Sequence, residues 1–131
     1  MQTTAYGIRR VVDRTYDDAL TRTRAALAAE GFGILSEIDI KEKLKEKLGV
    51  DFKRYVILGA CNPPLAHKAL QAEPEIGLLL PCNVIVYEES AKRSVVAAID
   101  PDSMVTVTGN ARIAEIAKDA KARLERALKA I

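Results

Sequence analysis

Two strand-like segments follow one another directly in this chain, and this succession limits the folds available to it most strongly. Residues 78–88 (LLLPCNVIVYE) and 94–100 (SVVAAID) are rich in β-branched residues and are separated by a short polar turn near residues 89–91. Such a pair predicts a β-hairpin, whose strands are antiparallel. A doubly wound, purely parallel sheet is therefore disfavoured, and no Gly-x-Gly-x-x-Gly turn follows the first strand-like segment.

The rest of the sequence alternates between strand and helix patterns. We expect further strands at residues 6–12, 32–40 and 54–60, and helices at residues 16–30, 41–48, 62–73 and 110–131. The order is then β-α-β-α-β-α-β-β-α, which indicates an α+β fold. We expect a two-layer sandwich with a mostly antiparallel or mixed sheet and helices packed on one face. A chain of 131 residues is of the size of one domain, so we predict a single domain over residues 1–131.

The final helix carries one continuous apolar stripe, which includes Ile113, Ala117, Leu124 and Leu128. A helix of this kind covers one face of a sheet. The strands alternate apolar and polar residues, so the other face or an edge of the sheet stays open. An open sheet surface favours association of two copies, and we expect a homodimer.

Two prolines modify these expectations locally. Pro81 interrupts the strand predicted at residues 78–88, which indicates an edge strand or a bulge at that position. The sequence Asp100-Pro101-Asp102-Ser103 is typical of a turn between the hairpin and the last helix.

Composition excludes several classes of function. The net charge of +2 is small, and the basic run between Lys41 and Arg54 is interleaved with acidic residues, so a nucleic-acid partner is not expected. No apolar run is long enough to cross a bilayer, and the N-terminal residues lack the apolar core of a signal peptide. The sequence therefore predicts no membrane partner and a cytoplasmic location.

The two cysteines are the most informative candidates for chemistry. Cys61 and Cys82 are each followed by asparagine, in Ala-Cys-Asn-Pro-Pro and Leu-Pro-Cys-Asn-Val. If Asn62 caps the helix that begins at Pro63, Cys61 lies just before a helix N-terminus, where the helix dipole favours the thiolate. Because the strands that carry the cysteines are neighbours in sequence, we expect the two thiols to share a site.

Several interpretations of this cysteine pair remain open. The pair, with Asn62 and Asn83, forms a reversible disulfide, a persulfide site or a soft-metal site, to which His67 on the following helix adds an imidazole. Free cysteines are also among the most buried residue types, and both thiols then simply pack in the core. The spacing of the cysteines lacks the close pairs of structural zinc sites, and no Gly-x-Ser-x-Gly motif indicates a hydrolase.

The sequence also resembles a known family. The motifs Leu-Gly-Ala-Cys-Asn-Pro at residues 58–63 and Leu-Pro-Cys-Asn-Val at residues 80–84, with the surrounding residues 31–104, are similar to the small bacterial and archaeal proteins grouped as domain of unknown function 302. The resemblance implies an α+β domain that often pairs as a homodimer. It implies no particular reaction. Other branches of the family keep the Asn-Pro and Leu-Pro frames without the cysteines, which implies a scaffold role for Asn62, Pro63 and Pro81.

Two hypotheses of function follow. In the first, Cys61 and Cys82 form a two-cysteine site for thiol or persulfide redox chemistry or for a soft metal. In the second, the chain is a homodimeric small-ligand-binding or interaction module in which the Cys-Asn-Pro and Leu-Pro-Cys-Asn segments are structural. No catalytic constellation decides whether the protein is an enzyme, and the sequence identifies no cofactor.

Overall fold

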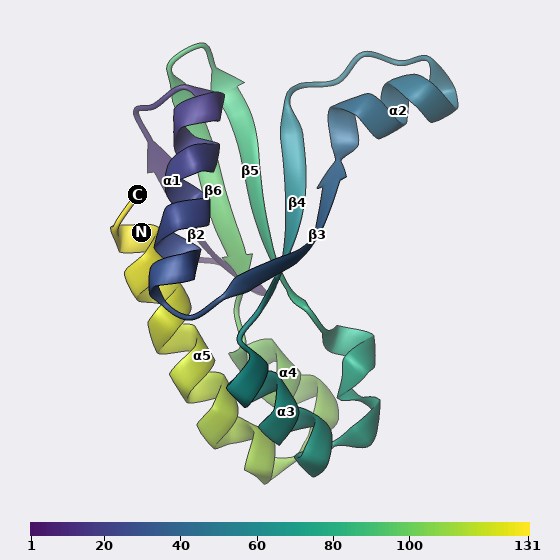
Figure 1. The fold of residues 1–131 in the computed structure, drawn as a ribbon, viewed down its shortest axis with the longest axis vertical. Helices are drawn as coiled ribbons and strands as arrows, with labels where there is room; N and C mark the ends of the chain where they lie inside the picture. Colours follow the sequence, from purple (N-terminus) through teal and green to yellow (C-terminus); the bar gives the residue numbers. More distant parts are fainter.

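The computed structural model describes residues 1–131, and it folds as an antiparallel sheet with helices on one face (Figure 1). The strands are β1 (Gln2–Thr3), β2 (Gly7–Val12), β3 (Gly33–Asp39), β4 (Tyr55–Cys61), β5 (Cys82–Ser90) and β6 (Arg93–Ile99). The helices are α1 (Tyr16–Ala29), α2 (Ile40–Leu48), α3 (Pro63–Ala72), the 3-10 helix η1 (Pro74–Leu79), α4 (Asp102–Thr108) and α5 (Ala111–Lys129). The predicted α+β class and the main order of elements are confirmed.

The six strands form one sheet in the order β1-β2-β6-β5-β4-β3, and every neighbouring pair is antiparallel. The predicted hairpin is β5–β6, at the centre of the sheet. In the β4–β5 ladder Leu58 lies opposite Val84 and Ala60 lies opposite Cys82. The register is fixed because alternate side chains of these strands enter the core.

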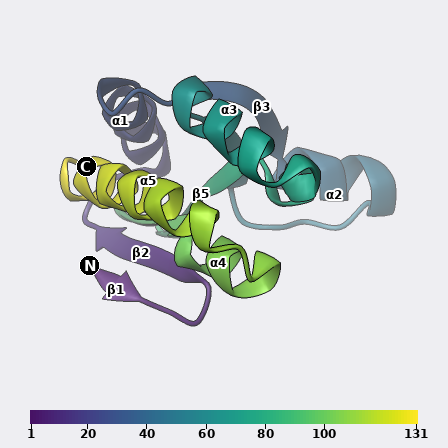
Figure 2. The same cartoon turned by 90° about the horizontal axis from the view of Figure 1, so that it is seen from below.

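The core lies between the sheet and two long helices. Leu58, Val84 and Val96 on the strands pack in one cluster with Leu27 of α1 and Leu124 of α5. Figure 2 shows α1 and α5 side by side on the same side of the sheet. The apolar stripe predicted on the last helix therefore packs against one face of the sheet, as expected. The opposite face carries no comparable cluster of buried side chains.

Local signals in the sequence set the ends of the helices. The Thr15 hydroxyl accepts a hydrogen bond from the Asp18 amide at the start of α1, and Asn110 caps α5 by accepting from the Arg112 amide. The Arg10 side chain on β2 donates to the carbonyl oxygens of Leu128 and Lys129. This contact fixes the last turn of α5, whose carbonyls lack partners within the helix, against the sheet.

The prediction for Pro81 is wrong. Residues 74–79 form η1, and β5 begins at Cys82, directly after the proline. The strand lies between β4 and β6 rather than at an edge. Because Pro81 has no amide hydrogen to contribute to a sheet, the ladder starts only beyond it.

The region after the hairpin also differs from the expectation. The turn predicted at Asp100 is present, since the Asp100 carboxylate accepts a hydrogen bond from the Asp102 amide. It leads into α4, a seven-residue helix that the sequence analysis did not predict. Met104 anchors α4 by packing with Cys82 and Ile113 in a second, smaller cluster.

The short helices gather at one end of the molecule. Figure 1 shows α3, α4 and η1 together beyond the start of β5, next to the N-terminal half of α5. The helix α2 projects from the opposite end of the sheet. None of the helices is long and apolar enough to cross a bilayer.

Candidate functional site

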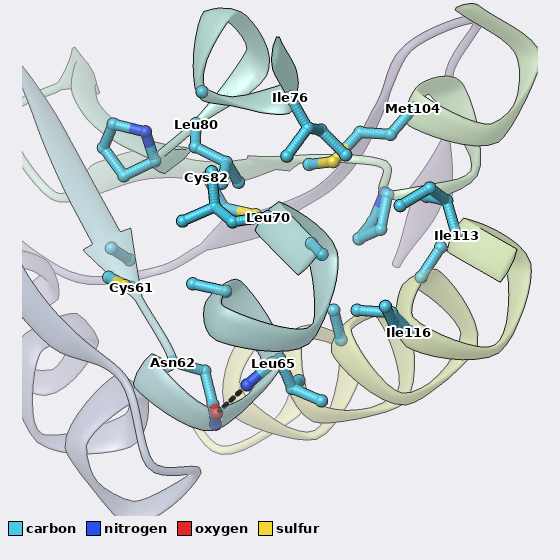
Figure 3. A pocket seen from close by; sticks show the side chains of 18 of the residues that line it. Cys61, Asn62, Leu65, Leu70, Ile76, Leu80, Cys82, Met104, Ile113 and Ile116 are labelled. Atoms are coloured by element: carbon cyan, nitrogen blue, oxygen red, sulfur yellow. Dashed lines mark hydrogen bonds between the residues drawn. The ribbon is translucent and has the colours of Figure 1, made fainter. Parts of the chain in front are cut away.

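A cavity of about 290 Å³ lies at the end of the sheet where the short helices gather. Its walls come from the ends of β4 and β5, from α3, η1 and α4, and from the N-terminal half of α5 (Figure 3). The lining residues are Phe32, Leu35, Ala60, Cys61, Asn62, Leu65, Ala66, Ala69, Leu70, Ile76, Gly77, Leu80, Pro81, Cys82, Pro101, Met104, Ile113, Ile116, Ala117 and Ala120. None of these side chains carries a charge. Leu35 and Leu70 are exposed, so the cavity reaches the surface.

Cys61 is the last residue of β4 and lies half-buried in the cavity wall. The next residue, Asn62, caps α3, because its side-chain oxygen accepts a hydrogen bond from the Leu65 amide at 3.3 Å. Its side-chain amide donates to the carbonyl oxygen of Glu30 at 3.5 Å. Both ends of the Asn62 side chain are thus engaged within the protein, and the predicted capping role is confirmed.

Cys82 is the first residue of β5 and is buried, with 8% of its surface exposed. Burial, and secondarily the neighbouring Cys61, raises the pKa of the Cys82 thiol from an ordinary value of 9.0 to about 11. The charged form is disfavoured because the apolar wall solvates a thiolate poorly. Cys82 is therefore a neutral thiol at physiological pH.

The structure brings the two cysteines to one cavity without joining them. Both thiols are free. In the sheet Cys82 lies opposite Ala60, whereas Cys61 pairs with Gly33 on the other side. Successive side chains of a strand point to opposite faces of the sheet. The residue on β4 that shares a face with Cys82 is therefore its cross-strand partner Ala60, and not Cys61.

Two other predicted site residues lie elsewhere. His67 is exposed on α3 and does not line the cavity, because the apolar face of that helix is formed by Leu65 and Ala69. Asn83 follows Cys82 on β5 and is exposed on the opposite face of the sheet. No group of three or more His, Cys, Asp or Glu side chains is placed to hold a metal ion.

Sequence reasoning missed most of the cavity wall. Ile113, Ile116, Ala117 and Ala120 belong to the apolar stripe of the last helix, which the sequence analysis assigned to core packing. Met104 lies on a helix that was not predicted. The available signal was the length of that stripe, because its first two turns extend beyond the sheet and need a separate partner.

An ion cluster stands beside the cavity. The Lys121 ammonium on α5 donates to the carboxylates of Asp100 at 3.2 Å and Asp102 at 2.7 Å, and these contacts raise its pKa. The cluster ties the start of α4 to α5. It therefore fixes the position of the wall that carries Pro101 and Met104 and contributes no charge to the interior.

Comparison with known proteins agrees with this architecture. A search of the curated proteins gave no match. One solved structure, a crystal structure of an uncharacterized conserved protein DUF302 from Bacillus stearothermophilus, superposes with a TM-score of 0.88 at 31% identity, over 96% of this chain and 98% of that one. The family model described as domain of unknown function DUF302 matches residues 8–131. By its fold and by this match, the chain belongs to the DUF302 family.

Proposed function

We propose that this protein binds a small, uncharged and mainly apolar molecule in the cavity between β4, β5, α3 and α5. The observation that carries the proposal is the composition of the wall, in which hydrophobic side chains surround two thiols and one amide that is already hydrogen-bonded. A carboxylate or phosphate placed inside would lose its hydration without finding a cation. Apolar pockets of this kind are the usual form of small-molecule sites.

The size of the cavity narrows the class of ligand. An apolar protein cavity of about 150 Å³ accepts a benzene molecule. The cavity here, at about 290 Å³, is roughly twice as large. A two-ring aromatic compound or a short branched hydrocarbon chain is therefore of suitable size, with any charged group left outside the mouth near Leu35 and Leu70.

A redox or soft-metal role for Cys61 and Cys82 has less support. Both reactions need thiolates. With a pKa of about 11, Cys82 holds about a hundredfold less thiolate at neutral pH than a thiol whose pKa is 9.0. We propose instead that the two cysteine side chains form part of the apolar wall and act as weak hydrogen-bond partners for the ligand.

The binding proposal is tested with two naphthalene compounds that differ in charge. We expect 1-naphthol to bind the wild-type protein and to raise its melting temperature, and 1-naphthoate to do neither at neutral pH. Titration calorimetry measures the affinity directly. Failure of 1-naphthol to bind up to its solubility limit would contradict the proposal, as would equal binding of the carboxylate.

A pair of matched substitutions locates the binding site. Ala66 lines the cavity from α3, and Ala66→Phe places a ring within it. Ala114 is exposed on α5 and does not line the cavity, so Ala114→Phe is the matched control for the same substitution outside the proposed site. Loss of 1-naphthol binding in the first variant alone is expected. If both variants bind like the wild type, the ligand occupies another site.

We further propose that the chain acts as a homodimer in the cytoplasm. The uncovered face of the sheet supports the dimer, because the cluster that contains α1 and α5 occupies the other face only. Two free thiols in one protein fit a reducing compartment. Sedimentation equilibrium at about 50 µM, where a weak dimer is already populated, tests the assembly.

A further inference from the structure

The face of the sheet opposite α1 and α5, here called the open face, has a hollow that is lined mainly by apolar side chains and also by Thr4, Arg9 and Asn83. It is formed by side chains that alternate with the core residues along β2, β4, β5 and β6, among them Tyr55, Ile85, Tyr87, Ala97 and Ile99. The hollow measures about 430 Å³. The rings of Tyr55 and Tyr87 stack at one side of it with their centroids 5.4 Å apart.

A second apolar surface is uncovered at the end of the molecule far from the cavity. The arm, defined as residues 40–54, consists of α2 and the loop that follows it, and Figure 1 shows it projecting beyond the sheet. No residue of α2 is buried. Leu48 is 69% exposed, Val50 44% and Phe52 39%.

The arm is held within its own chain by polar contacts, in which Lys41 donates to the Phe52 carbonyl oxygen at 2.7 Å and Lys45 pairs with Asp51 at 3.2 Å. A helix of nine residues is too short to be stable in water by itself, since isolated helices need about 12–15 residues even with favourable sequences. Asp39 and Gly49 cap its two ends, which fixes the helix limits but buries no apolar surface. The sequence therefore builds a helix whose apolar side chains need a partner from outside the chain.

The open face and the arm are continuous and complementary. The Phe52 ring lies 6.3 Å from that of Tyr55, so the arm begins where the open face ends. One surface is hollow and the other protrudes, and each exposes apolar side chains next to charged ones, Arg9 and Lys53 on the open face and the lysines of α2 on the arm. We propose that two copies of this chain pair with two-fold symmetry, so that the arm of each copy packs on the open face of the other.

The area required by a stable dimer supports the participation of the arm. Four strands spaced about 4.8 Å apart and about seven residues long present a plane of roughly 450 Å². A specific interface buries about 800 Å² on each partner. The open face supplies part of that area, and the two arms supply additional contact area at both ends of a two-fold interface.

The inference rests on the homodimer proposed above, and three glutamate substitutions test the two separately. Leu48→Glu changes the arm at an exposed position, and Asn83→Glu places a carboxylate in the hollow of the open face, opposite Gly59 and away from the Arg9–Ala97 pair. Leu78→Glu, at a residue that is 87% exposed on η1, is the matched control away from both surfaces. Circular dichroism and thermal unfolding establish that each variant is folded, and Asn83→Lys replaces Asn83→Glu if that variant is not.

We expect the wild type and Leu78→Glu to sediment as dimers. Leu48→Glu and the open-face variant should each weaken dimerisation by about a hundredfold or more, because in each a charged side chain must lose its hydration twice in the symmetric interface. Mixing the arm variant with the open-face variant should restore a heterodimer, visible by native mass spectrometry. That heterodimer retains one contact in which both the arm and the open face are unaltered.

The outcomes separate the two proposals. A monomeric wild type would refute the homodimer and the arm contact together. A wild-type dimer that Leu48→Glu leaves intact would refute the arm contact alone, as would the absence of a heterodimer in the mixture. A dimer that Leu78→Glu disrupts would show that the interface lies at the cavity end instead.

Discussion

The buried thiol of Cys82 makes the stability of this protein depend on pH in a direction that can be worked out. Its pKa is raised from 9.0 to about 11 in the folded chain, mainly by burial, whereas the unfolded chain exposes it to water. Between pH 9 and pH 11 the unfolded state has released the proton and the folded state still holds it. The unfolded state then binds fewer protons, so the free energy of unfolding falls as the pH rises.

The magnitude follows from the size of the pKa shift. Each unit of difference between the folded and unfolded values corresponds to about 1.4 kcal/mol. The contribution of Cys82 is fully present below pH 9; about 2 kcal/mol of it is lost by pH 11, where the folded thiol is half ionised, and about 3 kcal/mol at still higher pH. Such a loss is a large part of the 5–15 kcal/mol that stabilises a typical domain.

The assay is urea unfolding at several values from about pH 8 to about pH 11, on the wild type and on Cys82→Ala and Cys82→Val. Other groups titrate in this range, including Tyr16 and Tyr55, whose pKa values are raised by burial. These groups contribute equally to all three proteins. The difference in the free energy of unfolding between wild type and variant therefore isolates the pH-dependent contribution of the Cys82 thiol. The two variants differ in side-chain volume, which changes their stability by an amount independent of pH.

We expect the wild type to lose about 2 kcal/mol more than either variant across this range. Parallel curves for the wild type and both variants would refute the reasoning, because they would show that Cys82 ionises alike in the folded and unfolded states. The cavity wall would then be hydrated, and the proposal of an apolar ligand would lose its main support.

Three further substitutions test the fold. Gly59→Ala should destabilise the protein by more than about 1 kcal/mol in thermal unfolding, because its Cβ would collide with the Ser36 hydroxyl and lie 2.8 Å from Pro81; a neutral effect would show that the sheet relaxes there. Asn62→Ala should cost about 1 kcal/mol through loss of the α3 cap, and Asn62→Asp should retain most of it. Leu124→Ala should cost about 2–5 kcal/mol in urea unfolding, since this side chain is fully buried.

The sequence predicted the elements whose signals are local. The stripe on α5, the cap at Asn62 and the hairpin of β5 and β6 each depend on residues close together in the chain, and each was predicted. The helix α4 was missed because its residues Val105 to Thr108 are all β-branched, which is unfavourable for a helix. It forms because Met104 packs against Cys82 and Ile113, contacts that no local pattern reveals.

In the candidate site, too, the features that depend on local sequence could be predicted and those that depend on long-range packing could not. Cys61 and Cys82 were expected to share a site, and they line one cavity. Strand alternation already implied that Asn83, next to Cys82, points away from it, and the spacing of Leu65 and Ala69 implied that His67 lies off the buried face of α3. The cavity itself depends on how seven separate elements meet at one end of the sheet, and sequence spacing does not determine that arrangement.

The order of strands has a consequence for how the chain folds. Strand β6 pairs on one side with β5, a short turn away, and on the other side with β2, where Gly7 lies opposite Ile99. Closing a loop of about 90 residues costs about 4 kcal/mol of chain entropy, which favours early formation of β5–β6 and late docking of β2. The cavity is lined only by residues from Phe32 to Ala120. An intermediate in which β2 is still detached therefore already contains every residue of the cavity wall.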